Sequence, residues 1–140
     1  MLKNHLIWNP QRHGVGDAAI DADHRHMIAL INRIDDMLGG AGQIDNAWNV
    51  MDELLLATEA HFAQEEKIMA QHGYPDMPQH IEEHRKQLEQ MRNLIGEARH
   101  APSPAKVRLI PAFLVDWAEL HILHDDLKLG AFLSDSGKNA

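Results

Sequence analysis

Four stretches of this chain repeat apolar residues at the spacing of a helix, and short breaks rich in Gly and Pro separate them. The expected helices cover residues 18–38, 46–72, 78–99 and 104–129. Residues 1–16 lack helical periodicity and carry Pro10, Gly14 and Gly16, so they predict an irregular arm. Amphipathic helices joined by short turns are typical of an up-down-up-down bundle. The sequence therefore predicts an all-α four-helix bundle.

Local signals place the ends of these helices. Asp17 is an expected N-cap of the first helix, and Ser103 followed by Pro104 predicts the start of the fourth. Pro111 lies inside the fourth apolar pattern, which predicts either a kink or a later start of that helix. Gly130 is expected to end it and to leave a polar tail.

The composition sets limits on the class of protein. A chain of 140 residues is expected to form one domain, 1–140, with a core of its own. Thirteen basic and twenty-one acidic residues give a net charge of −8, which argues against a nucleic-acid or anionic-lipid surface. No stretch is apolar enough for a signal peptide or a membrane-spanning helix. We therefore expect a cytoplasmic protein without membrane insertion, and a monomer.

Histidine is the outlying residue, with eleven copies. The apolar stripes carry five imidazoles and one carboxylate, at His24, His61, Glu65, His80, His84 and His121. Residues four apart share one face of a helix, so the two pairs within this set point the same way. A lone buried His is usually a satisfied core residue, but burying five without partners would cost about 1–3 kcal/mol each. Their convergence predicts a metal site rather than a metal-free bundle.

The donor types narrow the metal. There is no cysteine, so any ion must be held by nitrogen and oxygen. Imidazole with carboxylate suits iron, manganese, zinc, copper or nickel, whereas calcium and magnesium prefer oxygen alone. Five imidazoles with at least one carboxylate exceed the usual ligand count of one ion. The sequence therefore predicts two ions, which Glu65 can bridge.

Four motifs resemble those of the hemerythrin family, specifically the bacterial hemerythrins, over roughly residues 8–127. They are "IDADH", "HFAQEEKIM", "YPDMPQHIEEH" and "WAELHILHDD". The resemblance implies a non-haem di-iron centre with a bridging oxo or hydroxo group. One iron would be held by His80, His84 and His121. The other would be held by His24 and His61 with one open position, and Glu65 and Asp126 would bridge the pair.

The carboxylate of the fourth helix is ambiguous from the residues alone. α-Helical geometry favours Asp125, four residues after His121, because Asp126 lies about 140° round the helix from that histidine. The family pattern H-x4-D points to Asp126, and we follow the resemblance. A bridging carboxylate would then approach the site from the side, and Asp125 would be an outer or surface residue.

The resemblance also implies a function: reversible dioxygen binding for carriage, storage or delivery. Dioxygen would be the ligand, with an oxygen-consuming enzyme as a receiving partner. An apolar wall around the oxygen pocket is implied at Met27, Ile28, Phe62, Trp117 and Ala118. We expect no enzymatic role beyond a weak peroxidase-type side activity. The alternatives are a di-iron enzyme acting on peroxide or nitric oxide, an oxygen or redox sensor, and an iron store.

The remaining polar residues have plainer interpretations. Solvated positions are expected for His26, His72, His100, Glu66, Glu82 and Glu83. Asp21 is expected to lie at the first-turn cap. Asp23 stands where the family often has Gln, directly before His24, and we expect little consequence from it.

Overall fold

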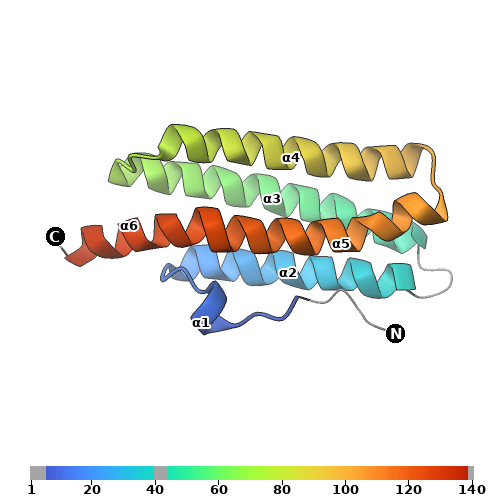
Figure 1. Cartoon of the computed structure of the whole chain (residues 1–140), viewed down its shortest axis with the longest axis horizontal. Helices are drawn as coiled ribbons and strands as arrows, with labels where there is room; N and C mark the ends of the chain where they lie inside the picture. The colour runs from blue at the N-terminus through green and yellow to red at the C-terminus, as the bar shows by residue number, and fades with distance from the viewer. Residues whose placement is uncertain (1–5, 40–43, 139–140) are drawn as a thin grey trace.

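A computed structural model describes residues 6–39 and 44–138, and within this part it contains no strand. Its helices are α1 (Pro10–His13), α2 (Ala18–Gly39), α3 (Ile44–His72), α4 (Met77–His100), α5 (Pro104–Leu120), the π-helix η1 (His121–Asp126) and α6 (Leu127–Lys138). Figure 1 shows α5, η1 and α6 running along the bundle as one long rod.

The long helices close into a bundle in which each packs against two neighbours. Contacts join α2 to α3, α3 to α4, α4 to α5, and α5 back to α2. Successive long helices run in opposite directions along the bundle (Figure 1). The predicted all-α four-helix bundle is confirmed.

The predicted starts of the helices depend on local caps, and two of these caps are present. The Asp17 Oδ1 accepts a hydrogen bond from the Ile20 amide at 3.0 Å, and the Ser103 Oγ accepts one from the Lys106 amide at 3.2 Å. Pro111 is buried inside α5, so the alternative of a later helix start is wrong.

The predicted end of the fourth helix at residue 129 is wrong. The chain remains helical through η1 and α6 to Lys138, so the expected polar tail is mostly helix. Gly130 does not take the positive φ of a helix-ending glycine, whereas Gly73, with φ +63°, follows the end of α3. Gly130 is instead buried against the arm, where its missing side chain lets the Val15 backbone approach closely.

The arm is irregular as predicted apart from the single turn of α1, and polar side chains of α2 hold it. Asp21 Oδ1 accepts from the Val15 amide at 2.8 Å, so Asp21 binds the arm rather than capping its own helix. The Asn32 side chain accepts from the Leu6 amide and donates to the Leu6 carbonyl, at 3.0 and 2.9 Å. Residues 1–5 of the arm lie outside the described residues.

Two apolar clusters divide the interior along its length. The smaller contains Ile20, Met69 and Leu129, and the larger contains residues such as Met27 and Phe62. Most of the predicted ligand residues lie between the two clusters in sequence: His24 falls between Ile20 and Met27, and Glu65 between Phe62 and Met69. The bundle therefore carries a polar layer across an otherwise apolar core.

Gly130→Ala is expected to destabilise the protein by about 1–3 kcal/mol, because an added Cβ would meet the Val15 carbonyl and lie 2.8 Å from the Val15 Cβ. Gly96 in α4 is the matched control, since it is exposed with open space around its Cβ position. Gly96→Ala should stabilise by up to about 1 kcal/mol. Urea unfolding of both variants measures the difference, and equal stability would show that the arm does not pack on α6.

Candidate metal centre

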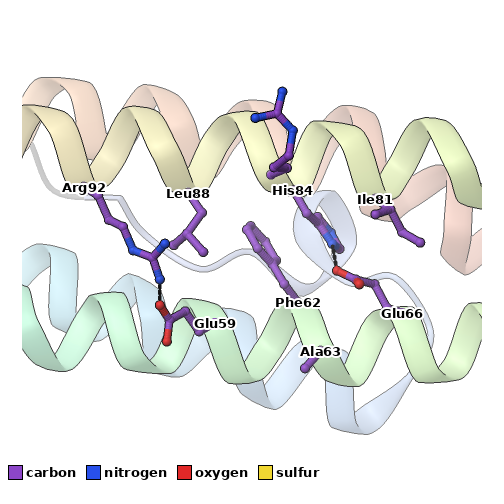
Figure 2. Close-up of a pocket in the computed structure, with 9 residues that line it drawn as sticks. Glu59, Phe62, Ala63, Glu66, Ile81, His84, Leu88 and Arg92 are labelled. Carbon is purple, nitrogen blue, oxygen red and sulfur yellow. Dashed lines mark hydrogen bonds and ion pairs between the residues drawn. The ribbon is translucent and has the colours of Figure 1, made fainter.

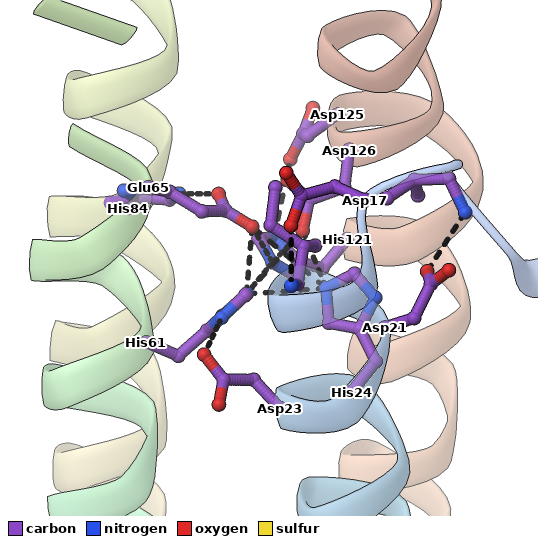
Figure 3. A network of polar contacts seen from close by, with 12 residues as sticks. Asp17, Asp21, Asp23, His24, His61, Glu65, His84, His121, Asp125 and Asp126 are labelled. Carbon is purple, nitrogen blue, oxygen red and sulfur yellow. Dashed lines mark hydrogen bonds and ion pairs between the residues drawn. The ribbon is translucent and has the colours of Figure 1, made fainter. Parts of the chain in front are cut away.

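All seven predicted ligand residues come together in the polar layer. They are His24, His61, Glu65, His80, His84, His121 and Asp126, each at most 5% exposed. Their donor atoms form two groups that share the carboxylates of Glu65 and Asp126. Figure 3 shows the side chains converging from opposite helices on this shared centre.

The Glu65 carboxylate spans the two groups. Its Oε1 lies 3.0 Å from Nε2 of both His80 and His84. Its Oε2 lies 2.7 Å from the Nε2 of His61. One carboxylate oxygen therefore faces each group, which is the arrangement that a bridging ligand needs.

Asp126 does the same from the opposite side of the bundle. Its Oδ2 lies 2.6 Å from the Nε2 of His24 and 2.7 Å from the Nε2 of His121. Its Oδ1 lies 3.2 Å from the Nε2 of His80. Both carboxylates thus contact imidazoles of both groups.

The π-helix explains how Asp126 reaches this position. In an α-helix, residues five apart diverge by about 140°, whereas the i→i+5 hydrogen bonds of a π-helix widen the turn and bring residue i+5 closer to the face of residue i. His121 and Asp126 are the first and last residues of η1. The carboxylate therefore points inward beside His121, and the lateral approach expected from the sequence is not needed.

Asp125 occupies the outer side of the same turn. Its side chain is 22% exposed, and its Oδ2 lies 3.9 Å from the Nδ1 of His121. It accepts a hydrogen bond from Gln87 Nε2 at 3.0 Å and belongs to neither donor group. The structure thus brings Asp126, and not Asp125, into the cluster.

One detail differs from the pattern that the resemblance implies. The donor atom of His121 groups with His24 and His61 rather than with His80 and His84. Its Nε2 lies 3.4 Å from the Nε2 of His61. The reason is local, because η1 places His121 beside the Asp126 oxygen that also faces His24.

Two outer carboxylates correct the sequence interpretation. Asp23 Oδ2 lies 3.1 Å from the Nδ1 of His61, and Glu66 Oε2 lies 3.1 Å from the Nδ1 of His84 (Figures 2 and 3). The expectation that Glu66 is merely solvated is therefore wrong, and Asp23 has a contact that the sequence interpretation did not foresee. Each directly adjoins a ligand residue on its own helix, so a rotation of about 100° aims it at the seam with the next helix. That adjacency to a ligand residue was the sequence signal that could have predicted these contacts.

These outer contacts determine how the imidazoles face the centre. A neutral His that donates from Nδ1 to a carboxylate carries its lone pair on Nε2. In His61 and His84 the Nε2 atoms are the ones that face Glu65. The two rings are therefore arranged as metal ligands are, with the lone pair directed inward.

The buried charges strongly shift the titration of the cluster. Burial alone would lower the pKa of His61, but the adjacent carboxylates of Asp126 and Glu65 outweigh it and raise the pKa to about 10. The same carboxylates overcome burial at His80 and raise its pKa to about 9. Burial and the Asp126 charge would raise the pKa of Glu65, but His61 and His80 lower it to about 2. A metal ion would therefore displace protons from the imidazoles rather than from the carboxylates.

The donor atoms are arranged to bind a metal rather than to hydrogen-bond to one another. Within the described residues, Glu65 Oε2 and Asp126 Oδ1 are buried and make no hydrogen bond of normal geometry. The Nε2 atoms of His24 and His61 face each other at 3.1 Å, although each of them also faces a carboxylate oxygen, of Asp126 and of Glu65 respectively. Buried polar atoms without partners cost about 1–3 kcal/mol each. The donor set and its aim suit a pair of transition-metal ions.

The five predicted wall residues are all buried: Met27, Ile28, Phe62, Trp117 and Ala118. Two of them lie flat against ligand rings. Phe62 stacks on His84 with ring centroids 3.8 Å apart, and Trp117 lies parallel to His121 at 5.7 Å. Figure 2 shows Phe62 between α3 and α4 beside His84. The wall restricts rotation of the ligands, and its role as an oxygen pocket stays a prediction.

The other histidines and acids lie largely where expected. His26, His72 and His100 are exposed, as are Glu82 and Glu83. His13 of the arm is buried, its Nδ1 accepts from the Asn9 amide at 2.9 Å, and its Nε2 lies 3.7 Å from Glu119 Oε2; it belongs to neither donor group.

A family model described as the Hemerythrin HHE cation binding domain matches residues 15–133. The chain belongs to the hemerythrin family. Similar relatives of this hemerythrin domain include a bacteriohemerythrin of Ralstonia nicotianae, 29% identical over 96% of this chain and 93% of the relative. Another is a bacteriohemerythrin of Aquifex aeolicus, 28% identical over 86% of this chain and 92% of the relative.

Solved structures support the fold. A wild-type hemerythrin crystal structure superposes with a TM-score of 0.79 at 23% identity, covering 92% of this chain and 98% of the other. An L114A hemerythrin mutant gives the same TM-score at 24% identity, with 92% and 97% coverage. Family, fold and the buried His/Glu/Asp cluster together identify a non-haem metal-binding domain. None of the helices in the described part of this hemerythrin domain has the length and apolar character needed to span a membrane.

Asp126→Ala is expected to reduce the metal content to half or less of that of the unmodified protein, because it removes a carboxylate shared by both donor groups. Asp125→Ala should retain the full metal content at saturating metal. Elemental analysis after dialysis measures the content, and circular dichroism checks that both variants are helical. Loss of metal from the Asp125 variant alone would reverse the assignment.

Asp23→Asn and Glu66→Gln should each weaken metal binding about 10–100-fold, because each removes the charge that orients a ligand imidazole. Glu83→Gln on exposed α4 surface is the control and should match the unmodified protein. Competition with a chelator gives the affinities. Metal affinities equal to that of the control would show that Asp23 and Glu66 are solvated surface residues without a part in metal binding.

Proposed function

We propose that this hemerythrin domain binds dioxygen reversibly at a non-haem di-iron centre, for carriage, storage or delivery. The observation that carries the proposal is the pair of buried carboxylates, Glu65 and Asp126, each shared by two groups of imidazoles. Two shared carboxylates imply two ions at bridging distance, and five imidazoles favour iron over the oxygen-preferring cations.

The residues divide into holders of two ions. His24, His61 and His121 would serve one, and His80 and His84 the other, with Glu65 and Asp126 common to both. When bound, two ferrous ions would supply two electrons and an open coordination position for dioxygen. The protein's own contribution is to fix the ligands, exclude water and withhold protons.

The lack of a proton donor in the wall of the site favours reversible binding of dioxygen over cleavage of its O–O bond. The wall residues Met27, Ile28, Phe62 and Ala118 have no acidic proton to give. Trp117 has an indole N–H, but that group donates to Gln87 Oε1 at 3.2 Å. A site that excludes water and has no free proton donor disfavours both the release of oxygen in a reduced form and the cleavage of the O–O bond.

A peroxidase-type enzyme is the second candidate, and one observation favours it. Asp23 and Glu66 place anionic acceptors on the Nδ1 atoms of His61 and His84, which makes these ligands more electron-donating. More electron-rich ions are easier to oxidise. The balance between this effect and the dry wall is what an experiment has to decide.

Anaerobic loading with ferrous iron should yield two irons per chain. Addition of dioxygen should produce a visible charge-transfer band that disappears under vacuum and returns on re-exposure over repeated cycles. Zinc-loaded protein is the control and should show no band. A band that decays irreversibly, with turnover of added peroxide, would favour the enzyme. A protein that retains zinc but no iron would exclude both the oxygen carrier and the di-iron enzyme.

The setting of this activity is also proposed. A net charge of −8 is consistent with a cytoplasmic monomer that supplies an oxygen-consuming enzyme.

A further inference from the structure

Gln87 is a buried polar residue of α4 that is not a candidate ligand. Only 5% of it is exposed, and it lies one turn after His84. Its amide bonds to two places on the next helix. Nε2 donates to Asp125 Oδ2 at 3.0 Å, and Oε1 accepts from Trp117 Nε1 at 3.2 Å. The orientation of the amide is determined, because an indole only donates and a carboxylate only accepts.

Both partners of Gln87 flank the same ligand, His121. The Trp117 ring lies parallel to the His121 ring, with an interplanar angle of 5°. Asp125 Oδ2 lies 3.9 Å from the His121 Nδ1, on the side of the ring away from the donor cluster. Figure 3 shows Asp125 next to Asp126 on the same turn, with His121 directed toward the centre. The Gln87 amide therefore fixes both the residue against the face of the His121 ring, Trp117, and the residue at its outer edge, Asp125.

His121 lacks the outer hydrogen bond that His61 and His84 have, and so does His24, whose Nδ1 is likewise buried without a hydrogen-bond partner among the described residues. Among the described residues, the Nδ1 atoms of His61 and His84 lie in hydrogen-bond range of Asp23 and Glu66, whereas the buried Nδ1 of His121 has no hydrogen-bond partner. Metal-bound His residues almost always donate this N–H to a carboxylate, carbonyl or water. Asp125 is the carboxylate that the structure places beside it.

We propose that Gln87 is a positioning residue for the metal centre, acting through Asp125 and Trp117 to orient His121. It holds the Asp125 carboxylate as the outer partner of His121 Nδ1 and holds Trp117 flat on the ring, so that Nε2 faces Asp126. The inference rests on the proposed metal centre. It adds a third outer carboxylate, and it ties α4 to the π-helix that carries both His121 and Asp126.

The surroundings of Gln87 make its loss measurable. Gln87 and Trp117 line a cleft of about 310 Å³ between α4 and α5, whose rim includes Phe113 and Leu120. Leu120 is 52% exposed. Without the amide, water in this cleft can compete for Asp125 and for the His121 N–H, so solvent exchange of that proton should report directly on the contact.

The test uses the full chain loaded with cobalt(II), which needs no dioxygen. Gln87→Leu removes both hydrogen bonds, and Asp125→Asn removes the charge. Gln90→Leu, on an exposed position of the same helix and cleft, is the matched control. Chelator competition gives the metal affinity. Proton NMR gives the exchange rate of the paramagnetically shifted His121 N–H, identified by its nuclear Overhauser effect to Trp117.

Gln87→Leu and Asp125→Asn should each weaken cobalt binding about tenfold or more and speed the N–H exchange by a similar factor. The double variant should fall short of the product of the two, since they act on one contact. The control should match the unmodified protein. Values within twofold of the control, or fully independent effects, would overturn the inference. If Gln87→Leu does not fold, Asp125→Asn and Gln87→Glu decide by the same measures.

These outcomes separate the inference from the proposed function. Tenfold losses in a protein that shows no reversible oxygen band support the positioning role and reject the carrier. A reversible band with unchanged Gln87 variants rejects the positioning role and supports the carrier. A chain that retains no metal rejects both.

Discussion

The rest of the structure depends on the contact between two buried carboxylates and five imidazoles in the middle of the bundle. Glu65 and Asp126 are fully buried, and their oxygens lie 2.6–3.2 Å from imidazole nitrogens of helices on every side. An isolated carboxylate in such a place would be strongly disfavoured, so each must be matched by protonated imidazole or by a cation. The layer is tolerable because apolar clusters above and below it supply the stability that it lacks.

A single irregularity in the fourth helix gives the layer its second carboxylate. Without η1, the residue aligned with His121 would be Asp125, and Asp126 would face away from the centre. The wider turn costs some regular helical hydrogen bonding, as π-helices do, and such turns occur frequently at functional sites. Here it places a ligand pair, while Asp125 is left outside to bond to Gln87.

Around this centre, each helix supports a ligand of its neighbour. Asp23 of α2 contacts His61 of α3, and Glu66 of α3 contacts His84 of α4. Gln87 of α4 continues the ring to Asp125 of the π-helix. Because these three contacts cross helix seams, the geometry of the centre and the packing of the bundle are coupled.

The sequence by itself determined the fold class, the approximate limits of the first three helices and the identity of six of the seven residues in the cluster. Periodicity and spacing within one helix carry that information, since residues four apart share a face whatever the helix packs against. The choice of Asp126 over Asp125 came from family resemblance, because α-helical geometry favoured the other residue. Only the tertiary structure decided the contacts of Asp23, Glu66 and Gln87, the grouping of His121, and the continuation of the chain past Gly130 as helix. Each of these depends on which side chain or backbone atom of another segment lies opposite. That partner is distant in the sequence and becomes a neighbour only when the helices pack.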